Sequence, residues 1–136
     1  LEGKQCRVYP APFGVRLFAR DGDGPEDVDT LVEPDISVVC DRSKLDQHGC
    51  KGAPEMVIEI LSPSTLRHDR LVKLNLYDQA GVLEYWIVDP QNRAVQVFRR
   101  DGGAALRICE EYGHRQVAKV SVLDGCFLEL SKVFPE

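Results

Sequence analysis

The chain has 136 residues, of which 43% are hydrophobic and 29% charged, and its 22 acidic and 17 basic residues give a formal net charge of −5. This composition indicates a soluble globular protein with a core of its own, and it excludes a disordered chain. There is no signal peptide and no apolar run near the roughly 20 residues of a membrane-spanning helix, so we expect a cytoplasmic protein without membrane contact.

Two short strands are predicted near the start of the chain, over residues 7–9 and 13–19, with prolines between them. Before them, residues 1–5 begin with leucine instead of methionine and read as the end of a helix. We therefore expect a single domain over residues 1–136 that is a fragment, without the N-terminal elements of a longer protein. The Gly- and Asp-rich residues 21–30 predict a loop.

The next predicted strands each carry one acidic residue. A strand over residues 31–40 has Asp35 near its start, directly after a proline. After a polar loop over residues 41–53, the apolar run MVIEIL predicts a central strand over residues 56–61 that contains Glu59. Because side chains alternate along a strand, Leu61 shares a face with Glu59.

A helix is predicted to follow, starting at the Ser- and Thr-rich residues 62–65 and ending at Ala80, with Gly81 at the position after its C-cap. Lys73 and Tyr77 are four residues apart and therefore lie on one face of this helix.

The rest of the chain reads as strands. A third buried strand is expected over residues 84–88 and includes Trp86 as a core residue, and its hairpin partner is expected over residues 94–100. Short peripheral strands and one helical turn are predicted over residues 106–111, 116–120, 127–130 and 131–134. This pattern predicts an α/β fold with a mixed β-sheet flanked by helices.

The five cysteines are scattered without a C-x-x-C pair, so we expect core thiols and neither a disulfide framework nor a zinc ribbon. Cys40, His48 and Cys50 are weak candidates for a metal site because the set lacks a fourth ligand with suitable spacing.

Asp35 and Glu59 are the candidate metal ligands. A lone acid inside an apolar strand needs a buried basic partner or a metal ion, whereas Asp35 alone is equally typical of a turn after proline. If the strands are adjacent, two carboxylates about 4 Å apart repel by roughly 4 kcal/mol at an effective dielectric constant near 20. Such a pair must take up a proton or hold a cation, for which Mg²⁺ is suited.

The candidate basic residues follow on the helix. Lys73 either pairs with Asp69, a contact worth about 0.3–0.5 kcal/mol when exposed, or stabilises the charge of a phosphate in a transition state. Tyr77 could line the cleft or pack as an aromatic residue. Contacts with DNA phosphates are considered for Arg67, His68, Arg70 and Tyr77, although a solvated helix start explains the first three residues equally well.

Four segments resemble a bacterial restriction-endonuclease-like family of the PD-(D/E)xK nuclease superfamily: VEPDISVV at 32–39, GAP at 52–54, VIEILSPST at 57–65 and GVLEYWIVDP at 81–90. The resemblance implies a restriction-endonuclease-like core with Mg²⁺ or Mn²⁺ on Asp35 and Glu59, and it adds the backbone carbonyl of Ile60 as a ligand. The usual lysine two residues after the glutamate is Leu61 here. In this family the lysine has moved to the helix, where Lys73 matches.

From these features we expect a Mg²⁺-dependent endonuclease that hydrolyses phosphodiester bonds of DNA. The alternative is a catalytically inactive nuclease-fold module that serves DNA-associated or protein–protein interactions, and a weaker one is a structural partner in a larger complex. The acidic balance and the lack of a DNA-reading motif favour the alternatives. An uncovered sheet edge or core face leads us to expect a homodimer.

Overall fold

The computed structural model describes residues 6–18, 30–62, 67–100, 105–123 and 125–134, and the side chains of residues 67–71 and 109 fall outside this description. The chain forms the following elements in order: β1 (Arg7–Pro10), β2 (Val15–Arg16), β3 (Leu31–Val32), β4 (Ile36–Val39), the 3₁₀ helix η2 (Arg42–Lys44), β5 (Leu45–Asp46), β6 (Gly49–Lys51), β7 (Met56–Ile60), α1 (Arg67–Ala80), β8 (Glu84–Asp89), β9 (Ala94–Arg100), β10 (Leu106–Gly113), β11 (Val117–Val120), β12 (Cys126–Glu129) and α2 (Leu130–Val133).

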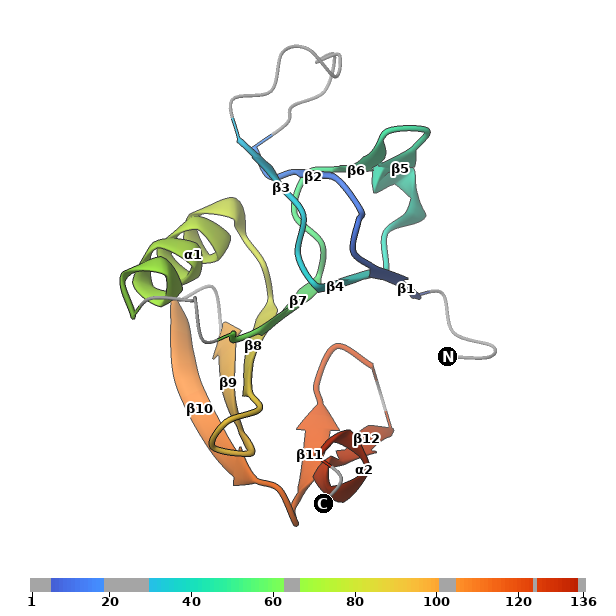
Figure 1. Cartoon of the computed structure of the whole chain (residues 1–136). Coiled ribbons are helices and arrows are strands. Elements are labelled where there is room, and N and C mark those ends of the chain that lie inside the picture. Colours follow the sequence, from blue (N-terminus) through green and yellow to red (C-terminus); the bar gives the residue numbers. More distant parts are fainter. Residues whose placement is uncertain (1–5, 19–29, 63–66, 101–104, 124, 135–136) are drawn as a thin grey trace.

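A six-stranded mixed sheet in the order β1-β4-β7-β8-β9-β10 forms the centre of the molecule. The central pair β7 and β8 is parallel and is joined by α1, whereas the other neighbours in this sheet are antiparallel. This β7-α1-β8 crossover, the mixed sheet and its flanking helix agree with the predicted α/β fold. Figure 1 shows α1 over one face of the sheet, with β11, β12 and α2 against the other.

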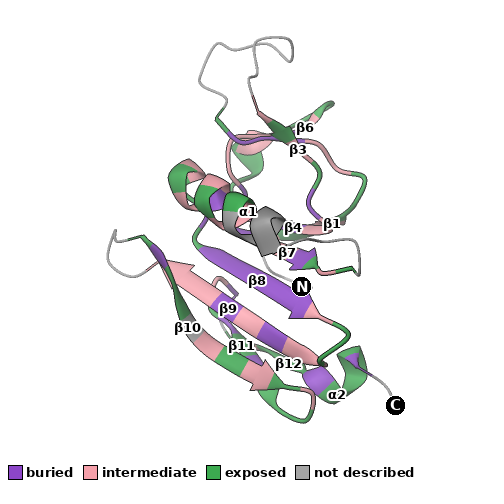
Figure 2. Ribbon diagram, turned by 60° about the vertical axis from the view of Figure 1, so that its left-hand side comes forward, coloured by how far each residue is buried: buried purple, intermediate pink, exposed green. Residues whose placement is uncertain are grey.

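Each face of the sheet covers its own apolar core. The core on the α1 side contains, among others, Val57, Tyr77, Val82, Tyr85 and Ile87. The core on the opposite side includes Met56, Trp86, Val95, Val97 and Leu130, so the prediction that Trp86 is a core residue is confirmed. Strand β8 is buried along nearly its whole length (Figure 2) because both of its faces are covered.

The predicted end of the helix is confirmed. Gly81 has a φ of +94° directly after α1. Its N–H donates to the Asp78 carbonyl at 3.2 Å, and the Val82 N–H donates to the Tyr77 carbonyl at 3.1 Å, which together form a Schellman motif. Val82 and Tyr77 belong to the same core, so the turn fixes the last part of α1 against the sheet.

A smaller sheet in the order β3-β2-β6-β5 corrects two predictions. The strand expected over residues 31–40 is divided into β3 and β4, which belong to different sheets, and Pro34 lies in the break between them. Residues 41–53, expected as a loop, contain η2 and the β5–β6 hairpin. The β5–β6 hairpin needs a glycine at position 49, because a Cβ atom on this residue would lie 2.1 Å from the Gly14 carbonyl oxygen.

The cysteine prediction is wrong for one pair. Strands β1 and β4 pair with Arg7 opposite Val39, and one step further places Cys6 opposite Cys40, where the two form a disulfide. Their separation of 34 residues gave no signal of this in the sequence. Cys50 is a buried free thiol, as predicted, and burial raises its pKa to about 11. Because Cys40 is bonded to Cys6, the disulfide excludes the candidate metal site that included Cys40.

The C-terminal part also departs from the prediction in one respect. Strand β10, expected as peripheral, extends to Gly113 and forms an edge of the main sheet. The β11–β12 hairpin and the single turn α2 follow as expected. Among the described residues, no helix has the length and apolar character needed to cross a membrane.

Candidate active site

Asp35 and Glu59 meet on the α1 side of the sheet. Strands β4 and β7 pair with Ile36 opposite Ile58, so one further step places Asp35 opposite Glu59. The Asp35 N–H donates to Glu59 Oε1 at 3.1 Å, and the Ile60 N–H donates to Asp35 Oδ2 at 2.7 Å. Directly opposite residues of an antiparallel pair project from the same face. The two acids therefore lie together at one point of the sheet.

Proline before Asp35 changes the pairing at this point of the sheet. Continuing the β4–β7 register places Pro34 opposite Ile60. A proline has no N–H, so Pro34 cannot donate a ladder hydrogen bond to the Ile60 carbonyl. The N–H and C=O of one strand residue point to the same side, and the Ile60 N–H is bound to Asp35. The Ile60 carbonyl thus points toward the β4 side of β7, where Pro34 offers no ladder donor.

Glu59 is buried, and two side chains from α1 satisfy its carboxylate. Only 7% of its side chain is exposed. Lys73 Nζ lies 3.0 Å from Oε2, and the Tyr77 hydroxyl donates to the same oxygen at 2.7 Å. A buried carboxylate is tolerated only with such partners. The sequence placed Lys73 and Tyr77 on one helix face but did not identify Tyr77 as the donor to Glu59.

Tyr77 acts from inside the core. The residue is 1% exposed, and burial together with the nearby Glu59 carboxylate raises the pKa of its hydroxyl far above the usual range. The hydroxyl therefore stays protonated and remains a donor to Glu59. This geometry corrects the expectation of a phosphate contact by Tyr77, because its polar atom faces Glu59 and is shielded from solvent.

Lys73 differs from Tyr77 in its access to solvent. Its side chain is 44% exposed, so its ammonium group can contact both Glu59 and a bound substrate. Leu61, at the position of the usual lysine, is half-buried and packs against the same core as Tyr77 and Val57. It therefore lies on the face of Glu59, as predicted, and Lys73 reaches that face from the helix.

The C-terminal end of α1 is fixed to β9 by a second basic residue. Arg100 Nη2 donates to the Asp78 carbonyl at 2.6 Å, and its Nη1 lies 3.1 Å from Asp78 Oδ1. A cation at a helix C-terminus is favourable for the free carbonyl groups and for the helix dipole. The helix that supplies Lys73 is thereby held at the sheet through contacts away from the acids.

The comparisons with known proteins concern the family and the fold of the chain. Residues 1–131 match the model of the Uma2 family, described as "Putative restriction endonuclease". The chain belongs to the Uma2 family. The resemblance found in the sequence is thus confirmed over nearly the whole chain.

One solved structure similar to this Uma2 chain is titled as the crystal structure of a putative nuclease belonging to DUF820 from Anabaena variabilis. It has a TM-score of 0.67 and 20% sequence identity, and the alignment covers 96% of this chain and 69% of that chain. At this identity the likeness establishes the shared fold. No curated protein matches the sequence.

The donor atoms of the Uma2 site fit a hard cation. Asp35 Oδ1 has no hydrogen-bond partner among the described residues, and Glu59 Oε1 accepts from the Asp35 N–H. By strand geometry the Ile60 carbonyl points to the same neighbouring strand as the Ile60 N–H that Asp35 accepts. Carboxylate and carbonyl oxygens are the ligands that Mg²⁺ prefers, with water and phosphate oxygens completing its shell. Within the described ranges, no group of three His, Cys, Asp or Glu residues forms a metal cluster, so protein ligands alone would leave the shell open.

Three candidate DNA contacts remain untested. Arg67, His68 and Arg70 belong to the first turn of α1, but their side chains lie outside the described residues. This turn is on the same helix as Lys73, and the sequence-based expectation for the three residues stays a prediction.

Proposed function

We propose that this Uma2 protein is a Mg²⁺-dependent endonuclease that hydrolyses phosphodiester bonds of DNA. The observation that carries the proposal is the convergence of Asp35, Glu59 and Lys73 from three separate elements onto one point of the sheet. The family description and the nuclease-fold neighbour support a nuclease, and the oxygen ligands support the choice of metal.

In this proposal Asp35, Glu59 and the Ile60 carbonyl hold Mg²⁺ or Mn²⁺. The bound ion would polarise the phosphate and lower the pKa of a water molecule. The protein contributes a rigid arrangement, because the backbone N–H groups of Asp35 and Ile60 fix both carboxylates before substrate arrives. Preorganised groups of this kind stabilise charge in the transition state without reorganising during the reaction.

Lys73 would stabilise the negative charge that develops on the phosphate. Its ammonium group is held beside the carboxylate that binds the ion, and it remains partly exposed. A substrate phosphate on the ion would therefore lie next to this ammonium. Tyr77 would act as a positioning residue, since its hydroxyl holds Glu59 from the buried side.

The competing function is a nuclease-fold module that has lost catalysis, and the net charge of −5 favours it because DNA binding generally needs a basic surface. Incubation of supercoiled plasmid with the protein and Mg²⁺ separates the two functions. We expect nicked or linear products that disappear with EDTA and with Glu59→Gln. If the DNA stays intact with the folded wild type under Mg²⁺ and under Mn²⁺, the result would contradict the endonuclease and support the non-catalytic module.

We further propose a homodimer in solution. The outer strand β1 forms one edge of the main sheet and exposes Val8, and such edges are commonly covered by another chain. Light scattering at micromolar concentration tests this proposal, and a monomeric mass would contradict it.

A further inference from the structure

A row of side chains continues from the acidic pair across the sheet. Glu59 is paired with Ile87 on β8, Ile87 with Gln96 on β9, and Gln96 with Glu111 on β10. Paired residues of neighbouring strands share a face, and strands lie about 4.8 Å apart. Gln96 is therefore two strands, or roughly 10 Å, from Glu59 on the side where the substrate would bind.

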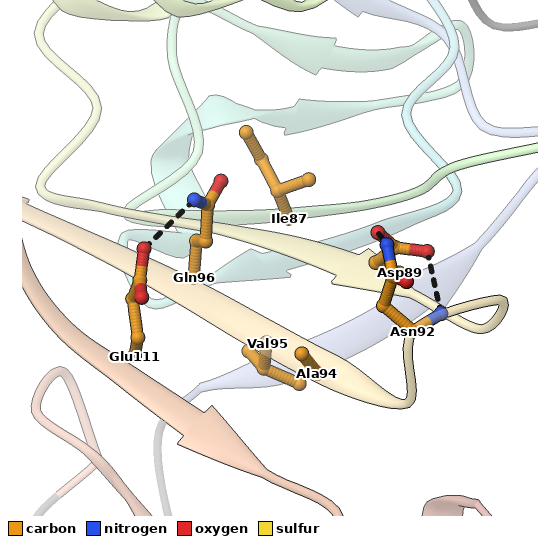
Figure 3. Close-up of a pocket in the computed structure, with 7 residues that line it drawn as sticks. All are labelled: Ile87, Asp89, Asn92, Ala94, Val95, Gln96 and Glu111. Atoms are coloured by element: carbon orange, nitrogen blue, oxygen red, sulfur yellow. Dashed lines mark hydrogen bonds between the residues drawn. The ribbon is translucent and has the colours of Figure 1, made fainter.

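A cavity of about 260 Å³ lies along this row, shown in Figure 3. Its lining residues come from β8, β9, β10 and the turn between β8 and β9: Ile87, Asp89, Asn92, Ala94, Val95, Gln96 and Glu111. Ile87 is 3% exposed and lies at the base of the cavity, where it is paired with Glu59 of the acidic pair. The volume is below the roughly 300–1,000 Å³ of pockets for drug-sized ligands, so it suits one small ring system.

The polar groups of the cavity are mainly acceptors. Gln96 Nε2 donates to Glu111 Oε1 at 3.0 Å, and Asn92 Nδ2 donates to Asp89 Oδ2 at 2.7 Å. The amide N–H groups are thus directed to carboxylates, as Figure 3 shows. Among the described residues, Glu111 Oε2 and Asn92 Oδ1 have no hydrogen-bond partner. An incoming ligand therefore meets acceptors and needs donors.

The charge of the cavity excludes a phosphate as its ligand. Asp89 and Glu111 are both carboxylates, and a further anion between them would be repelled by each. A neutral flat ring with an amino group fits better, because it carries no charge to be repelled and its amino group can donate to Glu111. Cytosine presents such a group at N4, and a carboxylate is a known partner for it.

We propose that this cavity is a subsite for one nucleobase with an exocyclic amino group, next to the scissile phosphate, with Glu111 as the residue that reads the amino group. The proposal rests on the proposed function, since it assumes a nucleic-acid substrate at Asp35 and Glu59. A base in the cavity must be unstacked from its neighbours, which favours single-stranded or locally opened DNA. The subsite thereby gives the proposed endonuclease a preference at one position of its substrate.

Nuclear magnetic resonance with single nucleosides tests the subsite without requiring catalysis. The probes are deoxycytidine and deoxyuridine, which differ in the amino or carbonyl group at C4 and the associated N3 proton. We expect saturable shifts of the backbone amide signals of Gln96 and Glu111 with deoxycytidine, at roughly millimolar affinity for so small a ligand. Deoxyuridine should bind about tenfold more weakly, the ratio that corresponds to 1.4 kcal/mol.

Two variants complete the test. Glu111→Gln keeps the shape and removes the charged acceptor, so the preference for deoxycytidine should fall to within about twofold. Glu129→Gln makes the same change on an exposed residue of β12 and should retain the preference. Equal binding of the two nucleosides by the wild type, no binding, or an unchanged preference in Glu111→Gln would overturn the proposal.

Cleavage assays run beside the titrations distinguish the two proposals. Nucleoside shifts as expected, together with intact plasmid and intact single-stranded DNA under Mg²⁺, would contradict the hydrolase and support the subsite. Plasmid cleavage together with equal nucleoside binding would contradict the subsite and support the hydrolase.

Discussion

Asp35 and Glu59 are joined by reciprocal contacts: the Asp35 N–H donates to the Glu59 carboxylate, and the N–H that follows Glu59 donates to the Asp35 carboxylate. The β4–β7 register alone places them opposite each other, so the acidic pair is a consequence of the sheet. The same contacts offset the repulsion between the two carboxylates, because a hydrogen bond to a charged carboxylate stabilises its charged form. The site is therefore formed before a cation or substrate arrives.

Glu59→Gln should weaken Mg²⁺ or Mn²⁺ binding more than tenfold and abolish cleavage, because the amide keeps the shape and removes the charge. Calorimetric titration of the folded variant measures the change. Glu84→Gln is the matched control. Glu84 is the other buried glutamate among the described residues, on the opposite face, where it accepts from Trp86 Nε1 at 2.6 Å and the Val122 N–H at 3.0 Å.

In the Glu84→Gln control we expect a loss of about 1–3 kcal/mol in the free energy of unfolding with unchanged metal affinity, because the charge of a buried acceptor is lost far from the site. Weaker metal binding by Glu84→Gln, or unchanged binding by Glu59→Gln, would contradict the assignment of the two acids.

Tyr77→Phe should lower the cleavage rate at least severalfold and weaken metal binding, since Glu59 loses the donor that fixes its orientation. The free energy of unfolding should fall by about 1–3 kcal/mol because a buried carboxylate loses a partner. Tyr112→Phe removes a comparable contact with Glu110 on another part of the sheet and should leave cleavage unchanged. Equal effects of both variants on the rate would show that Tyr77 has only a structural role.

Asp46→Asn tests a stabilising ion pair in the smaller sheet. The buried Arg16 guanidinium bonds to Asp46 and lowers the pKa of that carboxyl. The variant should lose about 1–2 kcal/mol of unfolding free energy at neutral pH, a value reduced for the exposure of Asp46. Because the pKa of Asp46 is lower in the folded than in the unfolded state, the ion pair stabilises the fold at pH values above the unfolded pKa near 3.9. This contribution disappears as the pH falls through the folded pKa.

The difference between wild type and Asp46→Asn should therefore be constant from neutral pH to about 5 and shrink below about 4. Denaturant titrations at several pH values measure it. Asp41→Asn, at an exposed acid whose pKa is lowered by Ser43 of the same turn, is the control and should change stability little. A difference that grows in acid would show that Asp46 is not the paired group.

The sequence predicted what depends on local pattern. The run around Glu59, the alternation that places Leu61 on its face and the glycine after Ala80 each follow from the period of a strand or the end of a helix. The pairing of Cys6 with Cys40 and the row from Glu59 to Glu111 depend on strand register, which links residues far apart in the chain and has no local signature.

The same limit applies to buried acids. Glu59 and Glu84 both stand in apolar strands, yet one faces α1 beside Asp35 and the other is satisfied by Trp86, Val122 and Arg99. Only the arrangement of neighbouring strands separates a candidate metal ligand from a structural carboxylate.

The position of the displaced lysine gives a further prediction. Leu61 shares the face of Glu59, so Leu61→Lys in a Lys73→Ala background should restore part of the cleavage rate if the new ammonium group reaches the phosphate. Leu61 is half-buried, and a partial recovery is the expected extent. Recovery is measured by single-turnover cleavage beside each single variant, and a double variant that stays folded but no faster than Lys73→Ala would contradict this placement.

The most direct test of the proposed mechanism is single-turnover plasmid cleavage by Lys73→Ala under saturating Mg²⁺. Lys132→Ala, at an exposed lysine paired with Glu129 near the C-terminus, is the control. We predict that Lys73→Ala cleaves at least about 100-fold more slowly, while its metal affinity and fold are retained, because it loses a transition-state contact and keeps the metal ligands. Cleavage by folded Lys73→Ala at the rate of Lys132→Ala and wild type would contradict the account.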